Sequence, residues 1–173
     1  MHVDLALLVL RVAVGVVIFA HGAMKLGWVG KGGTPAGTAG WLTSIGIRPG
    51  LFWAWVVILA EAGGGVLTIL GLGGPIGPGI VAGDLVVAII VAHIPKGFWN
   101  AQGGWEFIAP IAAGAFAIAL IGNGSWSLDG AFGLTYSSQL VYGWLAIVAA
   151  GALLALAIRV LAPKPKPAAG GAA

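Results

Sequence analysis

The sequence predicts an all-α integral membrane protein, and two observations carry that prediction. Hydrophobic residues make up 60% of the chain, charged residues only 8%, and the mean hydropathy is +1.05, whereas soluble domains carry about a quarter charged residues. Long apolar runs, suited to the roughly 20 residues of a membrane-spanning helix, are separated by short loops rich in glycine and proline. The runs lack the two-residue alternation of barrel strands, so helices are expected.

Five apolar runs are predicted to cross the membrane: residues 5–23, 51–72, 79–94, 107–122 and 140–161. The first run follows Met-His-Val-Asp, which lacks a basic segment, so we expect a retained span and not a cleaved signal peptide. The long connection at 25–50 contains residues 39–46, which are predicted to form a short interfacial helix. The glycine- and proline-rich residues 73–78 predict a tight turn.

Basic residues predict the orientation. With five spans, one side of the membrane receives most of them: Lys25, Lys31, Arg48, Lys96, Lys164 and Lys166. The opposite loops, 73–78 and 123–139, contain no Lys or Arg. The positive-inside rule therefore predicts a protein of the inner (cytoplasmic) membrane with its N-terminus outside and its C-terminus in the cytoplasm. The net charge of +3 is expected to meet anionic lipid, and no nucleic-acid partner is expected.

Function is expected at the ionisable residues within or beside the apolar runs, because a charged side chain at the centre of a membrane helix costs about 2.5–3.5 kcal/mol. These residues are Arg11, His21, Glu61, Asp84, His93 and Glu106. The chain contains no cysteine, which excludes thiolate metal sites, iron–sulfur clusters and a cysteine nucleophile within it. We expect no covalent cofactor and no metal site.

Arg11 and Glu61 are both predicted to lie near mid-membrane, where an ion pair between them would relieve two burial costs. Such a pair would either be purely structural or mark a functional site, and an unpaired Glu61 would instead be expected to hold a proton. On an ideal helix, Arg11 shares one face with Gly15, Gly22 and Lys25. Small residues on that face predict close approach of a neighbouring helix.

A second polar cluster is predicted at the cytoplasmic ends of the spans. His21, Lys25, His93 and Glu106 would lie at one membrane depth and form a pocket suited to a quinone head group, whose carbonyls need hydrogen-bond donors. Glu61, His93 and Glu106 are the candidate proton-handling residues. The alternatives are hydrogen bonds to loop backbone, haem ligation by the two histidines, or a metal site.

Asp84 is assigned a different place from this pocket. It lies nine residues before His93, which puts the two side chains on opposite faces of an ideal helix, so they are not expected to meet the same neighbour unless this span is central or kinked. Asp84 is also predicted to lie near the outer end of its span, where a helix-start or snorkelling role would suffice.

The chain resembles the DoxX family of small bacterial and archaeal membrane proteins over about residues 5–134. The matching segments are Arg11 with VAVG, His21-Gly22 with Lys25-Leu26, Glu61 with Gly63-Gly64, HIPKGF at 93–98 with GGWE at 103–106, and GNGSWSLD at 122–129. The resemblance implies a four-helix membrane bundle at 1–138, with an additional transmembrane helix at 139–162 and a disordered basic Pro/Ala/Gly tail at 163–173. It also implies that Arg11, His21, Lys25, Glu61, His93 and Glu106 form a shared polar core.

The resemblance further implies a quinone-linked redox setting. The expected function is that of a membrane subunit of a quinone-linked respiratory oxidoreductase or oxidase complex, with other redox subunits and the lipid bilayer as partners. A purely structural or assembly subunit is the alternative. A small-solute or proton transporter is disfavoured, because inverted repeats and paired broken helices are not evident in the sequence.

Overall fold

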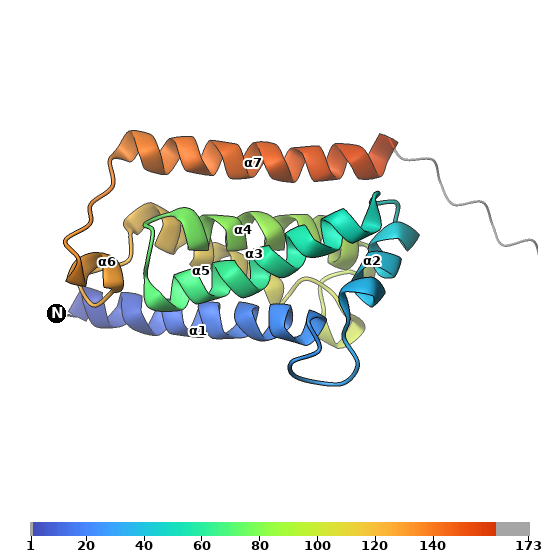
Figure 1. Ribbon diagram of the computed structural model, residues 1–173, viewed down its shortest axis with the longest axis horizontal. Coiled ribbons are helices and arrows are strands. Elements are labelled where there is room, and N and C mark those ends of the chain that lie inside the picture. Colours follow the sequence, from blue (N-terminus) through green and yellow to red (C-terminus); the bar gives the residue numbers. More distant parts are fainter. Residues whose placement is uncertain (1, 162–173) are drawn as a thin grey trace, which may run out of the picture.

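The computed structural model describes residues 2–161, in which helices run back and forth beside one another and no strand is present (Figure 1). The helical elements are α1 (His2–Lys25), α2 (Pro35–Ser44), α3 (Gly50–Leu70), α4 (Ile76–Ala88), the π-helical turn η1 (Ile89–His93), the 3₁₀ turns η2 (Ile94–Lys96) and η3 (Asn100–Gln102), α5 (Ile108–Ile121), α6 (Leu128–Ala131) and α7 (Ser138–Leu161). The all-α prediction is confirmed for this part of the chain. The expected tail at 163–173 lies outside the described residues.

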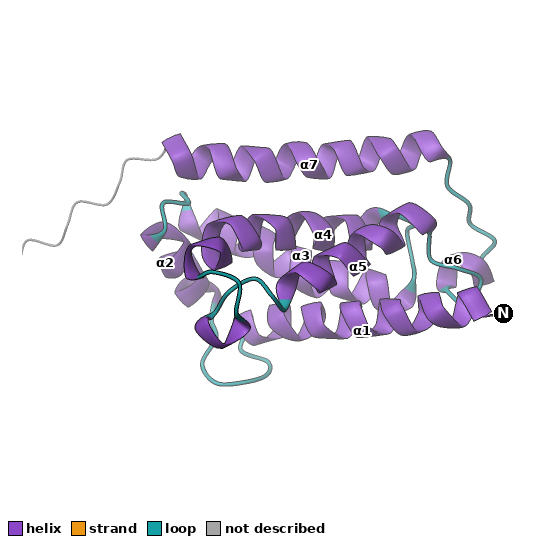
Figure 2. Cartoon of the chain, turned by 180° about the vertical axis from the view of Figure 1, so that it is seen from behind, coloured by secondary structure: helices purple, strands orange, loops and turns teal. Residues whose placement is uncertain are grey.

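Four helical segments within residues 2–161 are long and apolar enough to cross a membrane: His2–Lys25, Gly50–Leu70, Ile76–Lys96 and Ser138–Ile158. The chain is therefore a multi-pass membrane protein. The predicted span at 107–122 forms α5, which has 14 residues. At 1.5 Å per residue it is about 21 Å long, short of a hydrocarbon core of about 30 Å. A fifth full-length span is thus not confirmed, although α5 runs antiparallel beside α4 (Figure 2).

Local sequence signals set the helix ends. Gly71 adopts a left-handed conformation (φ 63°) after the last residue of α3, and its N–H donates to backbone carbonyls of that helix. This is the usual glycine stop. The predicted interfacial helix is α2, which begins earlier than expected because Thr34 caps it and Pro35 occupies its first turn. Helix α2 packs across α3 at the end of the bundle where α1 finishes.

The closest helix contact joins α1 to α3 through glycine. A Cβ added to Gly65 would lie 2.7 Å from the backbone nitrogen of Phe19, and one added to Gly22 would lie 2.5 Å from that of Ala62. Gly15 faces the backbone of Gly65 in the same way. The predicted close approach on this face of α1 is confirmed, because only glycine lets the two backbones come so near.

Helix α3 also packs closely against α4, at a glycine of α4. A Cβ on Gly77 of α4 would lie 2.6 Å from the Cβ of Leu67 and 3.1 Å from the carbonyl oxygen of Gly64. Gly64 and Gly65 are adjacent in sequence and thus face different neighbours, one α4 and the other α1. This places α3 between them. The apolar core beside this contact is formed by α1, α4 and α5, with Ile18, Val81 and Ile118 almost fully buried.

Helix α7 lies along the outside of this bundle (Figure 1). It packs mainly on α4, where Trp144 lies over Gly79 and Val148 over Gly83. Most of its other described side chains are exposed, as expected of a helix that faces lipid on most sides. Ala155 is a buried exception.

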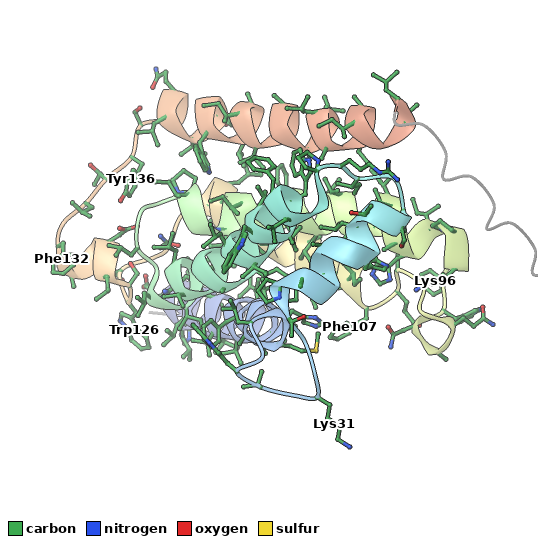
Figure 3. All side chains as sticks on the ribbon, turned by 45° about the vertical axis from the view of Figure 1, so that its right-hand side comes forward. Lys31, Lys96, Phe107, Trp126, Phe132 and Tyr136 are labelled. Atoms are coloured by element: carbon green, nitrogen blue, oxygen red, sulfur yellow. The ribbon has the colours of Figure 1, made fainter. Side chains whose placement is uncertain are left out.

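The two ends of the bundle differ in charge. Figure 3 shows Lys31 and Lys96 toward one end, and Trp126 and Tyr136 toward the other. Lys25 ends α1 and Lys96 ends η2, so these basic residues gather where α1 finishes. The loops at the opposite end, between α3 and α4 and between α5 and α7, contain no Lys or Arg.

We expect Gly65→Ala to lower the stability of the protein, because its methyl group would overlap the α1 backbone, which cannot move as a flexible side chain would. Overpacking of this kind costs about 1–3 kcal/mol. Thermal unfolding in detergent, followed by tryptophan fluorescence, measures the effect. The matched control is Gly63→Ala, two residues away on the same helix, where a Cβ would meet nothing within 4 Å. Equal melting temperatures for the two variants would contradict the close contact.

Candidate functional site

Arg11 does not pair with Glu61, so the predicted ion pair is wrong. The Arg11 guanidinium is 1% exposed and donates hydrogen bonds to two backbone carbonyls, Ile69 O at 3.0 Å and Trp126 O at 2.5 Å. The reason is that α1 and α3 are antiparallel, so the first half of α1 faces the last turns of α3. Ile69 lies eight residues, or about 12 Å, beyond Glu61. Arg11 thus joins α1, the end of α3 and the loop before α6.

Asp129 anchors the same end of the molecule, and sequence reasoning did not select it as a site residue. Its carboxylate accepts hydrogen bonds from the backbone of Gly73 (2.9 Å) and Gly74 (2.8 Å), from Asn123 Nδ2 (2.7 Å) and from the Tyr136 hydroxyl (3.0 Å). Burial opposes ionisation, but these four donors outweigh it and hold the pKa of Asp129 below its usual value of 3.8. Its position within the motif GNGSWSLD was the one available signal.

Glu61 is paired with Lys25 instead of Arg11. The Lys25 ammonium lies 2.6 Å from Glu61 Oε1 and 2.5 Å from Oε2, and the Glu61 side chain is only 9% exposed. Lys25 comes from the last turn of α1 and Glu61 from the middle of α3, so the pair joins the two helices that the glycines bring together. Both carboxylate oxygens are engaged by one cation.

This ion pair lines a cavity of about 470 Å³ inside the end of the bundle where α1 finishes. Its polar lining residues are His21, Lys25, Glu61, Asp84, His93, Lys96 and Asn100. The remaining wall is apolar and includes Trp41 of α2, Trp53 of α3 and Phe107 before α5. Trp41 and Phe107 are about half exposed, at 46% and 50%, so the cavity reaches the surface of the molecule.

Asp84 and His93 line the same cavity, which is expected only for a central or kinked span. Nine residues of ideal α-helix would separate them by about 180°. The chain between them is not an ideal helix, because residues Ile89–His93 form a π-helical turn. Its wider turn absorbs an additional residue and rotates His93 back toward the cavity. Turns of this kind are often found at functional sites.

Two other predicted residues bond to loop backbone. His93 Nδ1 lies 2.7 Å from the carbonyl oxygen of Gly103 and donates to it, which leaves Nε2 available. Glu106 accepts a hydrogen bond from the Asn100 N–H (2.9 Å) and does not line the cavity. The structure therefore brings together His21, Lys25 and His93 of the predicted quinone pocket and leaves Glu106 outside. His21, at the cavity edge, is exposed.

Asp84 is the residue whose environment differs most from expectation. It is the ninth of 21 residues in the segment Ile76–Lys96, so it lies near mid-span and not near the outer end. Among the side chains and backbone groups that the structure describes, none donates a hydrogen bond to its carboxyl group. It also borders a second, smaller cavity between α3, α4 and α7. A carboxyl group without a partner is unusual at this depth.

The arrangement can bind a ligand with an apolar body and hydrogen-bonding atoms. Lys25 and Lys96 offer donors, His93 Nε2 offers a position that gains or loses a proton, and Glu61 and Asp84 offer carboxyl oxygens. Among the described residues, no three His, Asp or Glu side chains converge as metal ligands would. The protein is therefore a multi-pass helical membrane protein with a partly polar cavity that opens at one end of its bundle.

The chain belongs to the DoxX family. The family model matches residues 6–94, just over half of the 173 residues. The match covers α1, α2, α3, α4 and η1, and it therefore contains the Lys25–Glu61 pair together with Asp84 and His93. It confirms the predicted resemblance. No curated protein and no solved structure matched the chain.

We expect Lys25→Met to destabilise the protein strongly, because it leaves the buried Glu61 carboxylate without its cation. Breaking one side of a buried pair costs about 3–5 kcal/mol. Combining Lys25→Met with Glu61→Gln should restore part of the loss, since both charges are then gone. Melting temperatures of the single and double variants measure the interaction energy between residues 25 and 61. Lys31→Met, at an exposed loop position, is the control; additive effects of the paired substitutions would contradict the ion pair.

Acid is expected to loosen the end of the bundle held by Asp129. Because its pKa is lower in the folded than in the unfolded protein, the unfolded state binds the proton first as the pH falls below about 4. The stabilisation is therefore complete above that pH and is lost as the pH falls through the folded pKa. The folded fraction in detergent, followed against pH, measures this loss. Asp129→Asn should be less stable at neutral pH and less sensitive to acid; unchanged acid sensitivity would contradict the assignment.

Proposed function

We propose that the protein is a membrane subunit of a quinone-linked redox complex and that its cavity receives the quinone head group. The observation that carries the proposal is the cavity of about 470 Å³ at the end of the bundle, which combines an apolar wall with proton-donating and proton-accepting side chains. Small-molecule sites typically have this size and this mixture of lining groups. Family membership supports a membrane protein of this type.

The chemistry of the lining fits a quinone. Trp41, Trp53 and Phe107 provide flat apolar surface for a ring, and Lys25 and Lys96 provide donors for ring oxygens. When bound, a quinone supplies electron transfer coupled to protons. This chain supplies the surroundings: His93 is fixed through Nδ1 by Gly103 and presents Nε2 as a proton-exchanging atom. Glu61 holds the Lys25 ammonium in place within the cavity.

The same proposal gives the protein an orientation. The end of the bundle that carries the cavity also carries Lys25, Lys31, Arg48 and Lys96, while the opposite loops lack basic residues. The positive-inside rule assigns this end to the cytoplasm and the N-terminus to the outside of the inner membrane. The quinone site would then exchange protons with the cytoplasm. Partner redox subunits would supply and remove the electrons, since the chain offers no thiolate ligand for a redox centre of its own.

An accessory role without chemistry is the second candidate, and two observations favour it. Glu106 and His93 both form hydrogen bonds with loop backbone, as residues with a purely structural role would. Most of α7 is exposed along its length, so it offers a surface for another membrane helix. In that case the Lys25–Glu61 pair serves only to join α1 to α3.

We expect short-chain ubiquinone or menaquinone analogues to quench the tryptophan fluorescence of the purified protein in a saturable way, because Trp41 and Trp53 line the cavity. His93→Leu should weaken the binding at least about tenfold, the equivalent of 1.4 kcal/mol. His2→Leu, an exposed histidine at the far end of α1, is the matched control. Quenching that does not saturate, or that is the same in all three proteins, would favour the accessory role.

A further inference from the structure

Asp84 lies between two cavities. It borders the large cavity of about 470 Å³ and also a smaller one of about 190 Å³, whose other lining residues are apolar or glycine. The smaller cavity is closed on one side by Val148, Gly151 and Ala152 of α7. Ala155 of α7 lines both cavities. Helix α7 therefore separates Asp84 from the lipid on this side of the bundle.

Among the side chains that the structure describes, no cation forms an ion pair with Asp84. From α3 it faces Glu61, and from α1 it faces Lys25, with His21 further along the same cavity. Lys25 holds both oxygens of Glu61 at 2.5–2.6 Å and is thus already paired. Helix α5 contributes Ile108 and Ile111, and α7 contributes the small and apolar residues named above. Past the end of α4, which carries Asp84, His93 of η1 and Lys96 of η2 also line the cavity.

An ionised carboxylate in this position would be expensive. It would lie at mid-span with no hydrogen-bond donor among the described residues, beside the negative charge of Glu61. A protonated carboxylic acid avoids that cost, and the cavity provides a route along which its proton can be transferred. Membrane proteins use intramembrane acids in this arrangement as proton relays.

We propose that Asp84 is the proton-binding residue of the cavity and that α7 forms the wall that shields it from lipid. The proposal rests on the proposed function, because the cavity is taken as the working site. Asp84 gives its proton to an acceptor atom in the large cavity, either on a bound ligand or at His93 Nε2, and takes one back from the basic end. The Lys25–Glu61 pair then has a positioning role. No group other than the proton is transferred.

Infrared spectroscopy of the full chain in lipid tests the proposal. A protonated carboxylic acid absorbs separately from carboxylates, and its band shifts in heavy water. We expect such a band at neutral pH in the wild type, its loss in Asp84→Asn and its retention in Asp129→Asn, whose substitution lies at the other end of the bundle. Absence of the band from the wild type, or its retention in Asp84→Asn, would overturn the proposal.

A second measurement remains decisive if Asp84→Asn fails to fold. Dicyclohexylcarbodiimide is an apolar reagent that adds to protonated carboxyl groups, and mass spectrometry of peptides locates the adduct. We expect the wild type to be labelled at Asp84 and not at Glu61 or Asp129, whose carboxyl oxygens are engaged by hydrogen-bond donors. Asp84→Glu should still be labelled at residue 84. Labelling at Glu61 alone would overturn the proposal.

The quinone-analogue titration separates this proposal from the function on which it rests. If the analogue binds but the acid band is absent, Asp84 is not the proton site and the quinone function stands. If the band and the Asp84 adduct are present but no analogue binds, the quinone function fails while Asp84 remains a proton-binding residue. Together, analogue binding and a band that shifts when the analogue is added support both.

Discussion

The backbone contact between α1 and α3 sets the position of every other element in the bundle. Gly15, Gly22 and Gly65 let the two helices approach until backbone meets backbone. In an apolar solvent there is little hydrophobic force between helices, so close packing and polar contacts hold them together. The contact fixes the register of the two antiparallel helices, and the register decides which charged groups meet.

Two polar anchors follow from that register, one at each end of the contact. At one end Arg11 donates to the carbonyl of Ile69, and Asp129 holds the α3–α4 turn through the backbone of Gly73 and Gly74. At the other end Lys25 meets Glu61. The first anchor satisfies backbone groups that a helix end leaves unpaired. The second lies in the wall of a cavity, so the same two charges join the helices and line the cavity.

Two further features shape the cavity: the π-helical turn that follows α4, and helix α7. The π-helical turn at Ile89–His93 turns His93 toward the space that Asp84 already faces. Helix α7 closes the lipid side of Asp84 with small residues. Because mid-membrane carboxyl groups are costly, a segment that shields one has a physical role even though it brings no described polar group to the site.

The helical membrane class, the family, the apolar runs and the glycine contact could all be predicted from the amino-acid sequence, because hydropathy and small-residue spacing are local properties of the chain. The sequence also grouped His21, Lys25 and His93 as residues of one site. The three-dimensional arrangement was needed to show that Glu61 pairs with Lys25 instead of Arg11, that Glu106 lies outside the cavity and that Asp84 lies inside it. Partners across helices depend on register and on one π-helical turn, and neither is encoded in the periodicity of a single segment.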